Sequence, residues 1–88
     1  METLLNTLSP IFKQYDFHSH SHSSKICYKN ASASPYDEFI VEMFPKTNEI
    51  VTIVPVGDIP YKKTFIDMNT AIDYMKMHLN HYQASNSN

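Results

Sequence analysis

The last third of the chain carries a helical pattern of apolar residues. Between residues 67 and 83, five apolar residues lie three, four, seven, eleven and fourteen positions after Met68, namely Ala71, Ile72, Met75, Leu79 and Tyr82. This spacing places all six side chains on one stripe of an α-helix. An isolated helix of this length is marginal in water, so we expect the stripe to pack against the rest of a folded domain. Asp67 or Asn69 is the expected N-cap, and residues 84–88 are expected to form a polar C-terminal tail.

The N-terminal segment shows the same helical spacing, interrupted by a proline. The apolar positions are Leu4, Leu5, Leu8, Ile11, Phe12 and Tyr15. Pro10 lies among them, and a proline inside a helix costs about 3 kcal/mol. We therefore expect two helical pieces that are separated at Ser9 and Pro10 and share one apolar face. The alternative is a single helix that begins at Pro10, with Ser9 as its N-cap.

Short segments of β pattern lie between these helices. The expected strands are residues 26–28, 36–44, 50–56 and 62–66, with a hairpin loop at 45–48 and a turn at 56–60. Residues 30–35 are expected to be a loop. Pro55 lacks an amide hydrogen, so its strand should end there or lie on an edge. The pattern predicts a small single α+β domain over residues 1–83, of order α-β-β-β(-β)-α, with N- and C-terminal helices packed on an antiparallel sheet.

The predicted central hairpin has apolar residues on both faces. One face is expected to carry Phe39, Val41, Met43, Val51 and Ile53, and the other Ile40, Phe44, Ile50 and Val54. A hairpin of this kind requires cover on both sides, from the chain's own helices or from a partner. We take the second set as a candidate partner-binding surface. Tyr74 and Met77 lie off the core stripe of the last helix and are further candidates for this role.

Residues 18–24 read His-Ser-His-Ser-His-Ser-Ser and contain no apolar side chain. We interpret them as an exposed connector. His18, His20 and His22 alternate, so an extended strand would present all three imidazoles on one side, as candidate ligands for zinc, copper or nickel. Cys27 could add a soft ligand. Residues two apart in a strand lie about 6.5 to 7 Å from each other, so the three histidines alone cannot reach one ion unless the backbone bends.

Composition excludes several classes of protein. The 88 residues fit one domain, and 42% hydrophobic residues predict a folded chain. The net charge is −2 and all seven basic residues are lysines. Because the phosphates and guanines of nucleic acid favour guanidinium, we do not expect nucleic acid as a partner. The lone Cys27 cannot form an intramolecular disulfide. No apolar run reaches the roughly 18 to 20 residues of a membrane span, and residues 1–8 do not resemble a signal peptide. We expect a cytoplasmic protein.

No constellation of catalytic residues accompanies the fold pattern. Asp37 and Glu38 would point to opposite sides of a strand, and Cys27 has no neighbour in the sequence that would lower its thiol pKa. We therefore expect no enzymatic activity and no cofactor. The element order is similar to that of the double-stranded-RNA-binding domain. Because those domains begin their last helix with lysines, and this chain has Asp67, Asn69, Thr70 and Asp73 there, we assign no family.

These observations favour a non-enzymatic protein–protein interaction module. It would act as a homo-oligomer or as a small subunit or accessory protein of a larger assembly. The usage of Asn, Lys, Ile and Tyr with little Gly and no Arg suits an AT-rich coding sequence, as in many viruses and phages, so a viral protein that binds a host factor is one form of this hypothesis. A metal-binding protein that uses the histidine run and a weak nucleic-acid-binding module are the alternatives.

Overall fold

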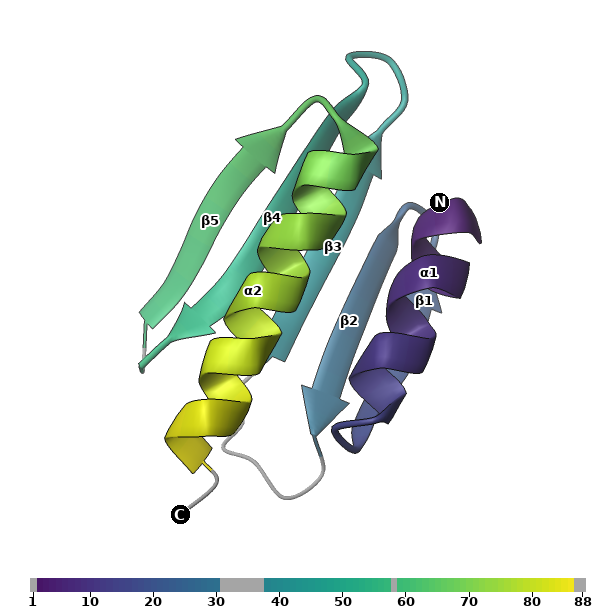
Figure 1. The fold of residues 1–88 in the computed structure, drawn as a ribbon. Coiled ribbons are helices and arrows are strands. Elements are labelled where there is room, and N and C mark those ends of the chain that lie inside the picture. Colours follow the sequence, from purple (N-terminus) through teal and green to yellow (C-terminus); the bar gives the residue numbers. More distant parts are fainter. Residues whose placement is uncertain (1, 31–37, 58, 87–88) are drawn as a thin grey trace.

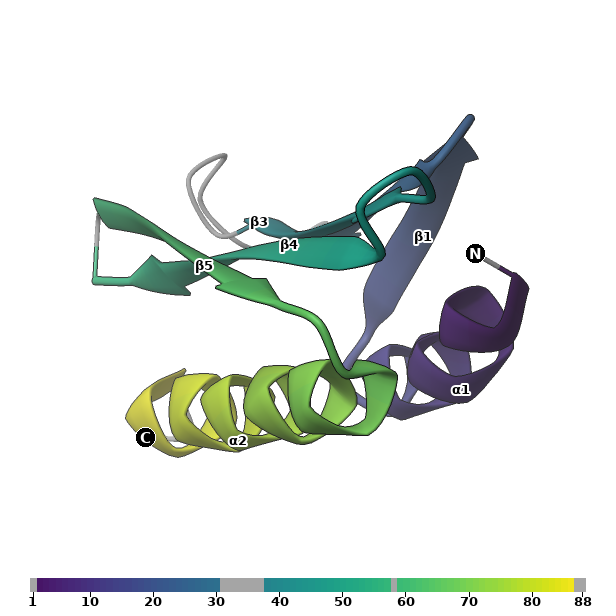
Figure 2. The same cartoon turned by 90° about the horizontal axis from the view of Figure 1, so that it is seen from above.

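Two helices cover one face of a five-stranded antiparallel sheet (Figures 1 and 2). The computed structural model describes residues 2–30, 38–57 and 59–86. The helices are α1 (Glu2–Lys13) and α2 (Met68–Asn86), and the strands are β1 (Phe17–His22), β2 (Lys25–Asn30), β3 (Glu38–Phe44), β4 (Glu49–Val56) and β5 (Ile59–Phe65). Each strand pairs with its neighbour in the sequence, so β1 and β5 are the two edges. The predicted α+β architecture is confirmed.

The polar segment at residues 18–24 is a strand over most of its length, so the prediction of a connector is wrong. β1 pairs with β2 from Phe17 opposite Asn30 to His22 opposite Lys25. The segment is exposed as expected, because only Phe17 of the six β1 residues is buried. A strand whose only apolar residue is Phe17 is compatible with an edge, where one side pairs and the other faces solvent. The predicted loop at residues 30–35 lies largely outside the described residues.

α1 is one continuous helix with Pro10 inside it, so the predicted break at Ser9 and Pro10 is wrong. Pro10 is exposed, and the apolar stripe on the opposite side is continuous: Leu4, Leu8 and Phe12 are fully buried. Burial of these three side chains offsets the missing backbone hydrogen bond, since each large apolar side chain removed from water contributes about 1.5 to 3 kcal/mol. Packing of the stripe therefore outweighs the local cost of proline.

α2 begins and packs as its sequence predicts. The Asp67 carboxylate accepts hydrogen bonds from the Thr70 backbone N–H at 2.9 Å and from the Thr70 hydroxyl at 2.7 Å, so Asp67 is the N-cap. The predicted stripe is confirmed in the described side chains, where Ala71, Ile72, Met75 and Leu79 are buried and Met68 is partly buried. The helix continues to Asn86, beyond the end that the apolar spacing indicates.

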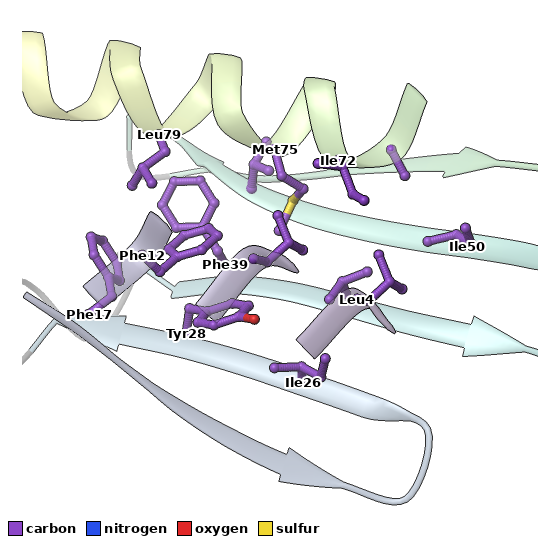
Figure 3. Close-up of a cluster of buried hydrophobic side chains, with 14 residues drawn as sticks. Leu4, Phe12, Phe17, Ile26, Tyr28, Phe39, Ile50, Ile72, Met75 and Leu79 are labelled. Atoms are coloured by element: carbon purple, nitrogen blue, oxygen red, sulfur yellow. The ribbon is translucent and has the colours of Figure 1, made fainter. Parts of the chain in front are cut away.

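An aromatic cluster forms the part of the core beneath α1 (Figure 3). The Phe12 ring stacks on Tyr28 with centroids 4.1 Å apart, and it meets Phe17 and Phe39 edge to face. Ser9 and Tyr28 share a hydrogen bond of 3.0 Å between their hydroxyls. These contacts join α1 to β1, β2 and β3, so the N-terminal helix is a structural part of the domain.

The strand register corrects the predicted division of the hairpin. Val41 lies opposite Thr52 and Met43 opposite Ile50, so the β4 residues on the helix side are Ile50, Thr52 and Val54, while Val51 and Ile53 share the outer face with Ile40. Thr52 is fully buried in the core because its hydroxyl donates to the Lys63 carbonyl at 3.0 Å. Both helices lie on the same side of the sheet (Figure 2), and the outer face has no cover from the described residues.

β4 neither ends at Pro55 nor forms an edge of the sheet, so both alternatives predicted from this proline are wrong, whereas the predicted end of the strand at Val56 is confirmed. The strand continues to Val56, and Pro55 lies opposite Pro60 of β5. In the described register, Ile53 is the last β4 residue that pairs with β3, so the proline interrupts no pairing on that side. The β4–β5 connection is tighter than predicted, because Ile59 and Pro60 already belong to β5. Gly57 has a φ of 63°, a left-handed conformation that glycine adopts without strain.

Candidate protein-binding surface

The structure divides the predicted partner-binding residues among three places. Ile50 and Val54 are 2% and 0% exposed under the helices, so they belong to the core and are not available to a partner. Ile40 is half-buried on the outer face of the sheet, and Phe44 is 41% exposed at the end of β3. Tyr74 and Met77 lie on α2, on the other side of the sheet. The six residues therefore do not form one surface.

Large exposed apolar side chains gather instead toward the tip of the β4–β5 hairpin. Val56 is 48% exposed, Ile59 69% and Tyr61 52%. Val56 lies opposite Ile59, and Tyr61 lies opposite the buried Val54, so all three share the sheet face that the helices cover elsewhere. They are exposed because the β4–β5 hairpin diverges from α2 toward its tip (Figure 2). The core face of the sheet thus continues beyond the core.

The flank of α2 packs against the other end of β5, where the strand leads into the helix. The Tyr74 ring packs against Phe65 of β5 with centroids 5.0 Å apart and against His78 at 4.5 Å. The Lys63 ammonium lies 5.2 Å from the Tyr74 centroid and 5.4 Å from that of Phe65, a favourable cation–π geometry. Met77 follows Tyr74 by one helical turn and is 47% exposed. We call Val56, Ile59, Tyr61, Tyr74 and Met77 the hairpin–α2 surface.

The electrostatics of this surface are those of an apolar patch with a positive margin. Burial raises the pKa of Tyr74, and the neighbouring Tyr61 raises it further. The Tyr74 hydroxyl is buried and has no hydrogen-bond partner among the described residues. Burial, with His81 and Lys63 nearby, lowers the pKa of His78, so this imidazole is neutral at pH 7. The charges of β5 itself come from Lys62 and Lys63.

His18, His20 and His22 follow one another along the outer face of β1, and all three are exposed. The register places His20 opposite Cys27, His18 opposite Lys29 and His22 opposite Lys25. As the side chains stand in the described part of the chain, no three His, Cys, Asp or Glu groups surround a common point in a way that could hold a metal ion. The pairing of β1 with β2 brings Cys27, the additional soft ligand considered from the sequence, to the histidine face.

The described residues offer weak support for catalysis. Burial raises the pKa of the Cys27 thiol, and the charge of Glu38 raises it further, so the thiol is protonated and poorly nucleophilic at neutral pH. A hollow of about 820 Å³ lies between α1 and β1. Its polar side chains include Lys13, Asp16 and His18, and none of these three has a hydrogen bond to another that would mark an acid–base pair in the described structure.

Comparison of the chain with models of protein families, with curated proteins and with solved structures finds no match. Neither described helix combines the length and the apolar character needed to cross a lipid bilayer.

Sequence reasoning missed the hairpin part of the surface because residues 56–60 read as a turn. A usable signal was present: Val54 and Val56 before Gly57, and Ile59 and Tyr61 after it, keep the alternation of one sheet face if the turn takes only two residues. The exposure of these residues was not readable from the sequence, because it depends on how the hairpin lies relative to α2 (Figures 1 and 2).

Proposed function

We propose that the chain is a non-enzymatic protein-binding module that contacts its partner through the hairpin–α2 surface. The observation that carries this proposal is the exposure of Val56, Ile59 and Tyr61, each 48–69% exposed, on one face of the β4–β5 hairpin, together with Met77 of α2, which is 47% exposed. Singly exposed apolar residues are ordinary on small proteins, whereas contiguous apolar patches on a soluble chain mark contact sites. Aromatic residues and methionine are also enriched in protein interfaces.

The physical reason for binding is the removal of this apolar surface from water. Tyr61 and Tyr74 are large and lose little conformational freedom when they are covered, so they suit the centre of an interface. Lys62 and Lys63 lie on the same strand and would form a charged rim that orients a partner with acidic groups. A subunit of a larger assembly, an accessory protein or a viral protein that binds a host factor would each use such a surface.

The test compares three forms of the untagged chain that are isolated from their own cells under non-denaturing conditions and weighed by native mass spectrometry. A triple variant, Ile59→Thr, Tyr61→Thr and Met77→Gln, removes the apolar surface and keeps strand and helix propensity. Ile66→Thr is the matched control, because Ile66 is 81% exposed and lies outside the hairpin–α2 surface.

We expect the wild type and Ile66→Thr to be recovered in the same complex of defined stoichiometry, and the triple variant to be recovered as a free monomer. The melting temperature of the triple variant should stay close to that of the wild type, since the substituted side chains are exposed. A wild-type chain that is monomeric in its cells, or a triple variant that remains in the complex, would disprove the proposal.

A further inference from the structure

The outer face of β1 and β2 carries imidazole and thiol side chains that could bind a zinc-type ion together. His18, His20 and Cys27 share this face, since His20 lies directly opposite Cys27 and His18 is the next residue of β1 on the same side. Directly opposite residues of an antiparallel pair have Cα atoms about 4.5 to 5.5 Å apart, and diagonal neighbours are about 7 to 8 Å apart. Imidazole and thiolate are the preferred ligands of zinc and of other borderline-soft divalent ions.

We propose that His18, His20 and Cys27 bind one divalent ion of the zinc type and thereby clip the edge strand β1 to β2. Three successive histidines of one strand cannot converge on an ion, but two of them with a ligand from the neighbouring strand form a compact triangle. The imidazoles must rotate to reach the ion, since no three ligands surround a common point as they stand. All three β1 histidines are exposed, so rotation displaces no packed neighbour.

The surrounding charges favour His18 over His22 as the third ligand. Lys29, opposite His18, has its ammonium 3.2 Å from the Glu38 carboxylate, so its positive charge is compensated where the ion would bind. Lys25, opposite His22, makes no ion pair within the described residues. Lys25 lies opposite Glu42 of β3 without an ion pair to it, so its charge is less closely compensated than that of Lys29. Like-charge repulsion therefore disfavours a cation beside His22. The fourth position of the ion remains open to water.

The site has a structural consequence for the edge strand. β1 contributes only Phe17 to the core. The exposed residues 18–22 are therefore held mainly by their pairing with β2. An ion bound by ligands from both strands would stabilise this pairing, because a ligand that binds only the folded state stabilises it by mass action. The inference does not depend on the proposed function, because the histidine face and the hairpin–α2 surface share no residue.

The test titrates untagged, reduced protein with Co²⁺ as a spectroscopic probe and with Zn²⁺ as the competing ion. We expect one Co²⁺ per chain with a thiolate charge-transfer band that Zn²⁺ abolishes. Cys27→Ser should lose this band. His18→Ser and His20→Ser should each weaken binding by at least about tenfold, the loss caused even by removal of groups that only support a ligand. His22→Ser and His81→Gln are the matched controls and should bind as the wild type does.

Thermal unfolding supplies a second measurement that does not use absorption. Zn²⁺ should raise the melting temperature of the wild type and of His22→Ser, and it should leave that of Cys27→Ser unchanged. Absence of binding, an equal loss in His18→Ser and His22→Ser, or an ion shared by two chains in native mass spectrometry would each overturn the proposed site. The triple variant of the hairpin–α2 surface should bind the ion normally, so failure of either proposal can be told from failure of the other.

Discussion

The hydroxyl of Tyr28 shows how one polar atom is accommodated in an aromatic core. The Tyr28 side chain is fully buried and its hydroxyl meets that of Ser9 at 3.0 Å. Burial raises the pKa of Tyr28, and the bond to Ser9 opposes that shift. A buried hydroxyl without a partner costs more than the bond itself contributes. The two partners of this bond are therefore unequal, since Ser9 is only partly buried.

Removal of the two partners should consequently have unequal effects on stability. Ser9→Ala leaves the Tyr28 hydroxyl buried and unpaired and should cost about 1 to 3 kcal/mol. Tyr28→Phe removes the buried group and should cost about 0.5 to 1.5 kcal/mol. The double variant should be no less stable than Ser9→Ala alone. Urea unfolding of the four proteins measures these differences, and additive losses in the double variant would contradict the argument.

The reactivity of Cys27 depends on its charged neighbours across the sheet. Burial and then Glu38 raise its pKa, whereas Lys25 and Lys29 lower it. A raised pKa leaves less thiolate at a given pH, so metal-free folded protein should react more slowly with a thiol reagent at pH 8 than protein unfolded in urea does. Glu38→Gln should accelerate the reaction of the folded protein. Glu49→Gln, on the same sheet face but not among the charges that shift Cys27, should leave the rate unchanged.

At the scale of the element, the start of α2 predicts a pH-dependent stability. The hydroxyl and the backbone N–H of Thr70 donate to the Asp67 carboxylate and lower its pKa. A carboxyl group whose pKa is lower in the folded state stabilises the fold above its unfolded pKa, and this contribution is lost as the pH falls through the folded pKa. Asp67→Ala should therefore lower the melting temperature at pH 7, and the difference from the wild type should shrink as the solution is acidified.

The control for this prediction is Asp73→Ala, which removes an exposed carboxylate from the same helix without removing its cap. A difference between Asp67→Ala and the wild type that stays constant from neutral to acidic pH would contradict the capping argument. Differential scanning calorimetry at a series of pH values provides the measurement.

The elements were predictable where apolar spacing had one clear period, and they were not predictable where it had none. The stripe from Met68 to Leu79 fixed α2, whereas residues 50–54 are all β-formers, so their pattern left open which residues face the core. Thr52 suggested the solvent side, and only its hydrogen bond to the Lys63 carbonyl explains why it is buried. Residues 18–22 of β1 show a clear alternation of His and Ser, but a polar segment of this kind is recognisable as a strand only once its pairing with β2 is known.

The candidate surface was predictable in part for a related reason. Tyr74 and Met77 were identified because they fall off the core stripe of α2, which is a property of the sequence alone. Ile50 and Val54 were assigned to the wrong face through the same ambiguity in β4. Ile59 and Tyr61 are exposed because the β4–β5 hairpin diverges from α2 toward its tip (Figure 2). This arrangement depends on tertiary packing, so no local sequence pattern predicts it.

At the scale of the whole molecule, both helices pack on one face of the sheet, and the outer face depends on its own side chains. This face alternates half-buried apolar residues, such as Ile40, Val51 and Ile53, with the charges of Lys29, Glu38 and Glu42. Long charged side chains cover much of the apolar surface beside them while they keep their charge in water. The two faces of β4 should therefore respond differently to the same chemical change.

The pair Val54→Thr and Val51→Thr tests this difference on a single strand. Val54 is fully buried, and a hydroxyl placed there without a partner should cost about 1 to 3 kcal/mol. Val51 is half-buried on the outer face, where threonine keeps β propensity and its hydroxyl reaches water, so the change should stay within about 0.5 kcal/mol. Urea unfolding at two protein concentrations separates the cases. If the two variants lose equal unfolding free energy and the losses grow with protein concentration, a second copy of the chain covers the outer face. If Val54→Thr loses more than Val51→Thr at both concentrations, the single layer of helices is sufficient cover for the sheet.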